Sequence, residues 1–314
     1  MIFQKKSEPR IVYMGTPEIS APIFEALIQE GYNVVALITN EDKVVGRKKI
    51  LEPTPTKVVA LKYGIPVYQP HRIRLDYQWL SSLNPDVIVC MAYGQLVPTE
   101  VLNMPKYGCI NLHGSLLPKL RGAAPIQRAI MEGDSQTGIT LMQMVDKMDA
   151  GLMYDKAEVA IDPKDNYTSL AHKISEAGKA LILKDLMPYL NGKLPGVPQD
   201  EAAVTIAHII KPENEKIPLD LPAKDFVNYV RGLSETPGGY LMLGNLKLKI
   251  YGAHRVNDQK TAPLGQIVLA DKSLVFQGSD GQISIDVLQL EGKKKMDARS
   301  FLNGAHGLRG ETLA

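Results

Sequence analysis

An amide and an imidazole stand two residues apart at the end of an apolar run in the middle of the chain. Asn111 and His113 flank Leu112 in this run. Residues i and i+2 of a strand face the same side, so both polar heads project together while Leu112 points to the opposite face. A carbonyl under attack can use such a pair, because both groups can donate hydrogen bonds to the oxygen that becomes negative. The alternative is a pair of satisfied polar groups at a strand end.

The elements around this pair alternate between apolar strands and helical patterns. Buried strands are expected at 10–14, 33–39, 86–91 and 109–112, and helices at 16–31, 56–63, 123–131 and 168–190. Thr16 is the expected N-cap of the first helix and Pro17 its first residue. This alternation is typical of a doubly wound, mostly parallel, Rossmann-like α/β sheet. Ligands of such sheets bind at the carboxyl ends of the strands, where Asn111 and His113 fall.

The pattern changes after residue 190. A connector rich in glycine and proline begins at Asn191, and a helix is expected at 223–233. Short strands separated by turns follow, which indicates a small OB-like β-barrel. We therefore expect a catalytic domain over 1–190, a linker over 191–207 and a C-terminal β-barrel domain over 208–314.

The composition restricts the class of protein. A length of 314 residues favours two domains, and a net charge of +2 is too small to identify a nucleic-acid binder. No apolar run is long enough to span a bilayer, and the N-terminus lacks the apolar core of a signal peptide. Cys90 and Cys109 lie in apolar runs and are expected to be buried free thiols, with a disulfide or a catalytic thiol as alternatives. We expect a cytoplasmic protein.

Common cofactor motifs are missing. Gly15-Thr16-Pro17 does not extend into G-x-G-x-x-G, and the chain holds no G-x-x-x-x-G-K-[ST]. The six histidines have no metal-ligand spacing to cysteines or acids. We expect neither a nicotinamide cofactor nor ATP nor a metal.

The run from Asn111 to Gln127, NLHGSLLPKLRGAAPIQ, resembles the signature of the folate-dependent formyltransferases, and most of all the group that acts on methionyl-tRNA. The segments 13–20 and 91–98 match the same family. The resemblance implies transfer of the formyl group of 10-formyltetrahydrofolate, a co-substrate, to the amino group of initiator methionyl-tRNA.

The resemblance also implies three catalytic residues. Asn111 would donate to the developing oxyanion, and His113 would either donate a second hydrogen bond or carry the proton as a general base. Asp149 would orient the imidazole. Asp146 lies in the same loop, but Asp149 is preferred because Ala150-Gly151 follows it as in the family.

Binding residues are implied less directly. The folate would contact Ser115, Leu116, Leu117 and Pro118, and the backbone of Ala92, Tyr93 and Gly94. The tRNA contacts would be Lys43, Arg47, Lys48, Lys49 and Arg121. From charge alone, the basic residues could equally form a solvated loop, and Arg121 a surface arginine beside a helix start.

Two rival functions remain at this stage. One is a formyltransferase for another amine, such as an amino-sugar nucleotide or glycinamide ribonucleotide. The other is a folate- or RNA-binding module without turnover. The basic loop and the barrel-like tail favour tRNA, and a monomer is expected.

Overall fold

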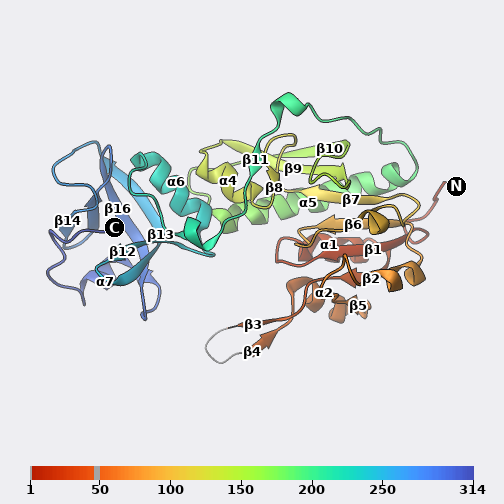
Figure 1. The fold of residues 1–314 in the computed structure, drawn as a ribbon, viewed down its shortest axis with the longest axis horizontal. Coiled ribbons are helices and arrows are strands. Elements are labelled where there is room, and N and C mark those ends of the chain that lie inside the picture. Colours follow the sequence, from red (N-terminus) through yellow and green to blue (C-terminus); the bar gives the residue numbers. More distant parts are fainter. Residues whose placement is uncertain (1, 46–49) are drawn as a thin grey trace. The chain divides into compact units, whose positions relative to one another are not determined.

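A computed structural model describes residues 2–45 and 50–314 (Figure 1). The chain forms two compact units. The first holds the residues up to Gly122, Thr137–Ala160 and Ala171–Ile206. The second holds Ala123–Gln136, Ile161–Leu170 and Ala207–Ala314. The second unit thus takes two short segments from the first 190 residues. Each unit is described by itself.

The first unit is built on a seven-stranded sheet (Figure 1). Its order is β10 (Met153–Ala160), β9 (Gln136–Gln143), β7 (Cys109–His113), β6 (Val87–Met91), β1 (Arg10–Gly15), β2 (Asn33–Ile38) and β5 (Val67–Tyr68). The strands from β7 to β5 are parallel, and β9 runs antiparallel to β7. This confirms the predicted doubly wound, mostly parallel sheet. All five residues of β6 are buried, as expected of a strand covered on both faces.

Helices α2 (Pro55–Tyr63) and α5 (Tyr167–Leu190) lie close to their predicted ranges, and α1 (Ala21–Gln29) falls within the range predicted for the first helix. The 3₁₀ helix η1 (Gln78–Leu83) and the short helix α3 (Thr99–Leu102) lie between β5 and β7 in the chain. Among the described helices, none combines the length and apolar character needed to cross a bilayer.

The predicted start of the first helix is wrong. Helix α1 begins at Ala21 with Ser20 as its N-cap, not at Thr16 and Pro17. The Thr16 hydroxyl donates to the carbonyl of Tyr93 (3.0 Å) instead of capping a helix. The buried Tyr13 hydroxyl bonds the Ser20 hydroxyl (2.9 Å) and donates to its carbonyl (3.0 Å). These long-range contacts hold residues 16–20 as a turn over the sheet.

The predicted basic loop contains a hairpin. Strands β3 (Lys43–Val45) and β4 (Ile50–Glu52) pair antiparallel. The Lys57 ammonium anchors the base of the hairpin, because it donates to Asp42 (2.6 Å) and Gln69 (2.9 Å). The hairpin therefore starts from a fixed point beside α2.

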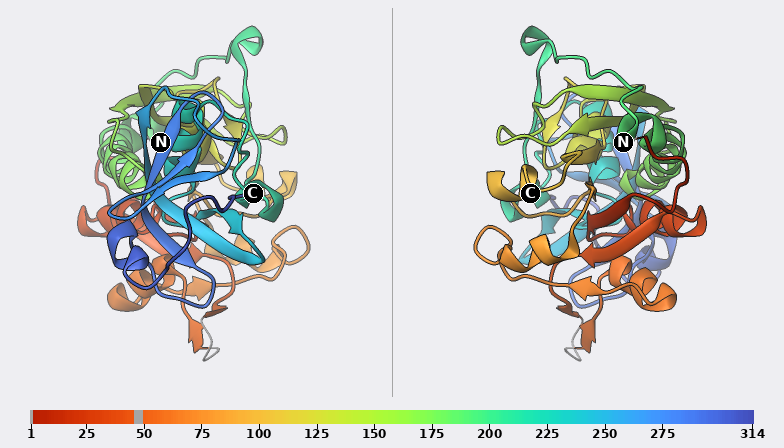
Figure 2. Two further views of the ribbon diagram at one scale, coloured as in Figure 1. Left: turned by 90° about the vertical axis from the view of Figure 1, so that its left-hand side faces the viewer. Right: turned by 90° about the vertical axis from the view of Figure 1, so that its right-hand side faces the viewer.

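The second unit contains an antiparallel barrel, seen at the C-terminal end of the chain in Figures 1 and 2. Its strand order is β12 (Gly239–Leu243), β13 (Leu246–Asn257), β16 (Gln282–Leu290), β15 (Leu274–Gln277) and β14 (Ile267–Ala270), and β17 (Met296–Asp297) pairs with β16. The last residues close the ring. Ala314 exchanges two hydrogen bonds with Met242 of β12, and Ile267 of β14 donates to Glu311 (2.8 Å). The predicted barrel is thus completed by the C-terminal segment.

Three α-helices lie wholly within the barrel unit: α4 (Pro125–Met131), α6 (Ala223–Leu233) and α7 (Ala298–Leu302). Helix α6, predicted with these bounds, buries Phe226 against Phe276 of β15, with ring centroids 5.4 Å apart. Leu313 is fully buried in the same core, so the closing segment is held by packing as well as by hydrogen bonds. Short elements not expected from the sequence are β8 (Arg121–Gly122), β11 (Ile206–Ala207), and the 3₁₀ helices η2 (Glu201–Ala203) and η3 (Pro212–Glu215).

Candidate active site

Strand β7 places Asn111 and His113 at its carboxyl end. His113 is 5% exposed, whereas Asn111 is half-buried. No hydrogen bond to a described residue occupies the Asn111 carboxamide. A half-buried amide without a partner is ready to donate to a ligand oxygen.

The two ring nitrogens of His113 have different partners. The Nε2 atom lies 2.9 Å from the carbonyl oxygen of Leu120, which can only accept, so Nε2 carries a proton. The Nδ1 atom lies 3.6 Å from Oδ2 of Asp149. At this distance the two groups make no direct hydrogen bond, and Nδ1 is the ring atom that the protein leaves for a ligand.

Asp149 is held in an uncommon backbone conformation. Its φ is +51°, in the left-handed region that L residues rarely adopt. Its Oδ2 accepts a hydrogen bond from the backbone N–H of Gly122 (2.8 Å). By contrast, Asp146 is exposed, and its carboxylate accepts a long hydrogen bond from Thr99 (3.4 Å). The structure therefore brings Asp149, and not Asp146, to His113.

The two cysteines are free and buried, as predicted. Burial raises the pKa of Cys90 to about 12, with a small contribution from the charge of Asp149. Burial also raises the pKa of Cys109 far above that of an ordinary thiol. Both remain protonated near neutral pH and are unsuited to act as nucleophiles.

The predicted folate segment 115–118 is largely occupied by the protein itself. Ser115 and Leu117 are fully buried, and the Ser115 hydroxyl donates to the carbonyl of Lys119 (2.6 Å). The Thr140 hydroxyl accepts from the Leu117 N–H (3.1 Å) and donates to the Ser115 carbonyl (2.7 Å). The Lys156 ammonium donates to the Leu117 carbonyl. Only Leu116 and Pro118 are partly exposed, so this segment has few groups to offer a ligand.

The second predicted folate segment forms a turn after β6. Ala92 and Gly94 are exposed with φ of +51° and +87°. The carbonyl of Tyr93 accepts from Thr16 and from Asn40 (2.9 Å), which fixes the turn. The Tyr93 hydroxyl is buried and has no hydrogen-bond partner in the described part of the chain.

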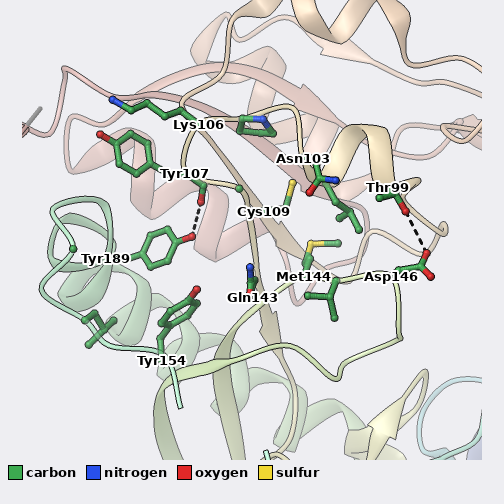
Figure 3. Close-up of a pocket in the computed structure, with 16 residues that line it drawn as sticks. Thr99, Asn103, Lys106, Tyr107, Cys109, Gln143, Met144, Asp146, Tyr154 and Tyr189 are labelled. Carbon is green, nitrogen blue, oxygen red and sulfur yellow. Dashed lines mark hydrogen bonds between the residues drawn. The ribbon is translucent and has the colours of Figure 1, made fainter. Parts of the chain in front are cut away.

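A cavity of about 640 Å³ opens beside β7 (Figure 3). Cys109 lies on its wall, and Cys109 shares a strand face with Asn111 and His113. The wall continues into Met144–Asp146, at the start of the loop that leads to Asp149. The remaining lining includes Leu102, Asn103, Tyr107, Gln143, Tyr154 and Tyr189. Sequence reasoning missed this cavity, although the i, i+2 rule already placed Cys109 on the strand face of Asn111 and His113.

The predicted tRNA contacts differ in their exposure to solvent. Lys43 is exposed on β3, whereas Arg47, Lys48 and Lys49 lie outside the described residues. Arg121 is only 3% exposed, and its guanidinium donates to Gln199 (2.9 Å) and Glu201 (2.8 Å). This placement indicates a structural role for Arg121 and gives no support to a direct phosphate contact. Among the residues the structure describes, no group of three or more histidines, cysteines or acids could hold a metal ion.

Comparisons with known proteins identify the family of this chain. The formyl transferase family model matches residues 9–186, and the model of the formyl transferase C-terminal domain matches 209–306. The methionyl-tRNA formyltransferase of Bacillus thuringiensis (strain Al Hakam) is 45% identical over 299 residues, which is 94% of this chain and 95% of that protein. The chain belongs to the methionyl-tRNA formyltransferase family.

Solved structures share the fold at lower identity. HypX from Aquifex aeolicus, crystallised with tetrahydrofolic acid, has a TM-score of 0.68 at 16% identity. The match covers 97% of this chain but 49% of HypX, so the chain spans about half the length of that protein. An N-formyltransferase from Helicobacter canadensis, in complex with folinic acid and dTDP-3-aminofucose, has a TM-score of 0.65 at 18% identity over 91% of this chain and 99% of that one. Proteins that differ widely in sequence thus share the fold of this chain.

Proposed function

We propose that this protein transfers the formyl group of 10-formyltetrahydrofolate to the free amino group of initiator methionyl-tRNA. The observation that carries the proposal is the unpartnered Asn111 carboxamide next to an imidazole whose Nδ1 faces Asp149. The identity to the Bacillus enzyme over nearly the whole chain supports the choice of methionyl-tRNA over a small-molecule amine.

The proposed chemistry follows from these groups. An α-amine titrates near 7.7–8.0, so a substantial fraction is neutral at pH 7–8 and can attack the formyl carbon. A C–N bond forms to the amine, and the formyl oxygen becomes negative. Asn111 donates to that oxygen, and His113 acts through Nδ1 either as a second donor in its protonated form or as the acceptor of the amine proton in its neutral form. The bond from carbon to N10 of the folate then breaks, while the amine loses a proton and N10 gains one. The His113–Asp149 pair is the acid–base couple available to carry that proton.

The cavity beside β7 is the proposed site for the pterin end of the co-substrate. Leu102 and Met144 offer apolar contacts, while Gln143 and Asp146 are polar groups that can contact the ring edge. Cys109 and Leu102 belong to the same buried cluster as Tyr93, so the predicted Ala92–Gly94 turn adjoins this region. A small-molecule site of this kind is mostly apolar with a few polar groups.

Filling the cavity tests its role. In Val145→Trp the indole would occupy cavity space, because Val145 lines the cavity and is 37% exposed. We expect the KM for 10-formyltetrahydrofolate to rise at least ~10-fold, and the KM for the tRNA to stay unchanged. Val58→Trp, at an exposed valine of α2 outside the cavity, is the matched control. An unchanged folate KM in Val145→Trp would place the co-substrate elsewhere.

For the tRNA we propose contacts from the β3–β4 hairpin, starting with Lys43, and from the barrel unit. Basic side chains on an exposed hairpin can neutralise phosphates without base readout. We further propose that the protein acts as a monomer in the cytoplasm, where its tRNA substrate is charged. Light scattering on the purified protein tests the monomer.

The test of the whole proposal is formyl transfer from 10-formyltetrahydrofolate to charged initiator tRNA, with charged elongator methionine tRNA alongside. We expect rapid modification of the initiator and little of the elongator. Transfer to neither tRNA, with the folate still bound, would point to a small-molecule amine such as an amino-sugar nucleotide.

A further inference from the structure

We infer that Gln199 is a positioning residue for Asp149, and that Arg121 sets the direction of the Gln199 carboxamide. Gln199 lies in the segment expected from sequence to be a plain linker. The inference rests on the proposed formyl transfer only because that reaction is its readout. All the contacts that carry it lie within the first unit.

Gln199 holds the backbone of residues 149–151, called the catalytic turn below, at both of its ends. Its Nε2 donates to the carbonyl oxygens of Asp149 (2.8 Å) and Gly151 (2.9 Å). Both protons of the amide group are thereby used on one short stretch of loop. Side-chain donors that satisfy two carbonyls of one turn fix its backbone conformation.

Arg121 determines which end of the carboxamide faces the loop. Its Nε donates to Oε1 of Gln199 (2.9 Å). A guanidinium can only donate and a carbonyl can only accept, so the flipped amide would lose all three hydrogen bonds. The buried arginine thus acts on the loop through Gln199.

The catalytic turn requires such support. Asp149 has a φ of +51°, which is unfavourable for an L residue. Gly151 packs so tightly that a Cβ there would lie 2.0 Å from the carbonyl oxygen of Gln143. A turn held in this conformation keeps the Asp149 carboxylate on the Gly122 N–H and beside His113.

A second anchor strengthens the clamp. Glu201 accepts from Arg121 (2.8 Å) and from Lys147 (3.0 Å), which lies two residues before Asp149. The hydrogen bond from Arg121, followed by that from Lys147, lowers the pKa of Glu201 to about 2. The same segment reaches the support of His113, because the Thr205 hydroxyl accepts from the Leu120 N–H (2.9 Å). Gln199, Glu201 and Thr205 therefore support both members of the proposed acid–base couple.

The test is the nearly isosteric variant Gln199→Glu. It keeps an acceptor for Arg121 and adds an ion pair, but it replaces the NH2 group, with its two donors, by one oxygen that repels the carbonyls of Asp149 and Gly151. We expect kcat to fall at least ~10-fold with both KM values within ~3-fold of wild type, as for a group that acts on the chemical step. We expect the melting temperature to be unchanged or raised. If Gln199 served only as a partner for Arg121, Gln199→Glu would keep full activity, and that result would overturn the inference.

A double-mutant cycle with Asp149→Asn makes the test independent of folding. If Gln199 works through the Asp149 carboxylate, Gln199→Glu should reduce the rate of Asp149→Asn by no more than ~2-fold. Full additivity of the two losses would overturn the inference. Gln199→Met, which removes the polar head, should repeat the loss of Gln199→Glu, and full activity in this variant would also overturn it.

The controls separate this inference from the proposed function. Asp200→Asn alters the neighbouring side chain, which accepts only from the Ala202 N–H, and should leave the rate unchanged. The wild-type protein is assayed in parallel. Absence of formyl transfer by the wild type would refute the proposed function, whereas normal transfer by both wild type and Gln199→Glu would refute only the role of Gln199.

Discussion

The two ring nitrogens of His113 have different surroundings. Nε2–H is bonded to the Leu120 carbonyl, so Nδ1 is the ring atom left for a ligand. Leu120 itself has a φ of +59°, an unusual value for leucine. An uncommon backbone conformation in a buried leucine that contacts a site residue indicates that the fold aims this carbonyl at the ring. Nε2 therefore fixes the ring on the Leu120 carbonyl, whereas Nδ1 faces Asp149.

Asn111 gives the most direct prediction at this scale. Because its carboxamide has no partner in the described residues, Asn111→Ala should leave the melting temperature nearly unchanged. Loss of one donor to a developing oxyanion costs about 2.7–4 kcal/mol of barrier, so kcat should fall ~10²–10³-fold. Single-turnover formyl transfer measures the loss. A kcat within a few-fold of wild type would remove Asn111 from the oxyanion site.

Asp149 and Asp146 can be separated in the same way. Asp149→Asn keeps an acceptor for the Gly122 N–H but removes the charge beside His113. We expect kcat to fall ~10²-fold or more, the scale of positioned acid–base groups. Asp146→Asn is the comparison, because its carboxylate is exposed and does not face His113, so its kcat should stay within ~2-fold and any change should be confined to the KM for the folate. Equal losses in the two variants would contradict the assignment of Asp149.

Among single residues, the placement of Asn111 and His113 could be predicted from the sequence, but that of Arg121 could not. The shared face of Asn111 and His113 follows from strand geometry, and the structure places both at the end of β7 as expected. The burial of Arg121 could not be foreseen, because its partners Gln199 and Glu201 lie 78 and 80 residues further along the chain. Local pattern gives the direction of a side chain on a strand, whereas its partner is set by tertiary contacts.

At the scale of elements, buried strands and capped helices were predictable and irregular segments were not. The start of α2 needs only local groups, since Thr54 accepts from the Lys57 N–H and Gly64 ends the helix in the left-handed region. The start of α1 depends on contacts outside the helix. Tyr13 of β1 binds Ser20, and the carbonyl of Tyr93, far along the chain, accepts from Thr16. The β3–β4 hairpin was missed because three-residue strands carry almost no periodic signal.

The packing of α5 on β10 gives a pH-dependent prediction. Burial, followed by the hydrogen bond and charge of Asp155, raises the pKa of Asp185 to about 6. One Asp185 carboxylate oxygen has no hydrogen bond among the described residues. At pH values between the ordinary pKa of an aspartate and about 6, Asp185 is protonated in the folded state but ionised in the unfolded state. The free energy of unfolding therefore rises as the pH falls through that range.

Asp185→Asn should therefore be more stable than wild type at pH 7.5, by up to about 2 kcal/mol, with the gain shrinking toward pH 4. Thermal unfolding at several pH values measures it. Asp155→Asn is the control, and its effect on stability should have the opposite sign. Burial alone would raise the pKa of Asp155, but hydrogen bonds from Lys184 and from the Lys156 backbone outweigh burial and lower the pKa. That variant should be destabilised at pH 7.5. A pH-independent effect of Asp185→Asn would contradict the assignment.

At the scale of the whole molecule, function is spread over distant parts of the chain. The proposed catalytic couple of His113 and Asp149 is held by contacts from Leu120, Gly122 and Gln199, and the barrel is closed by its last residues. The composition gives no hint of either dependence. It does bound the electrostatics, because a net charge of +2 cannot supply a strong general attraction for RNA. Any affinity for tRNA must come from a few local contacts.

The salt dependence of tRNA binding tests that view. Each phosphate neutralised by a basic side chain adds about 0.7–0.9 to the slope of log K against log salt. We expect a slope of modest size, which Lys43→Glu should reduce by about 1. The same variant should weaken the binding of initiator and elongator tRNA equally, because a phosphate contact carries no sequence information. Filter binding over a series of KCl concentrations measures both quantities. Lys5→Glu, at an exposed lysine outside the hairpin, makes the same charge change and should leave the slope unchanged. If Lys43→Glu weakened only initiator binding, the hairpin would be a reader of bases and not of phosphates.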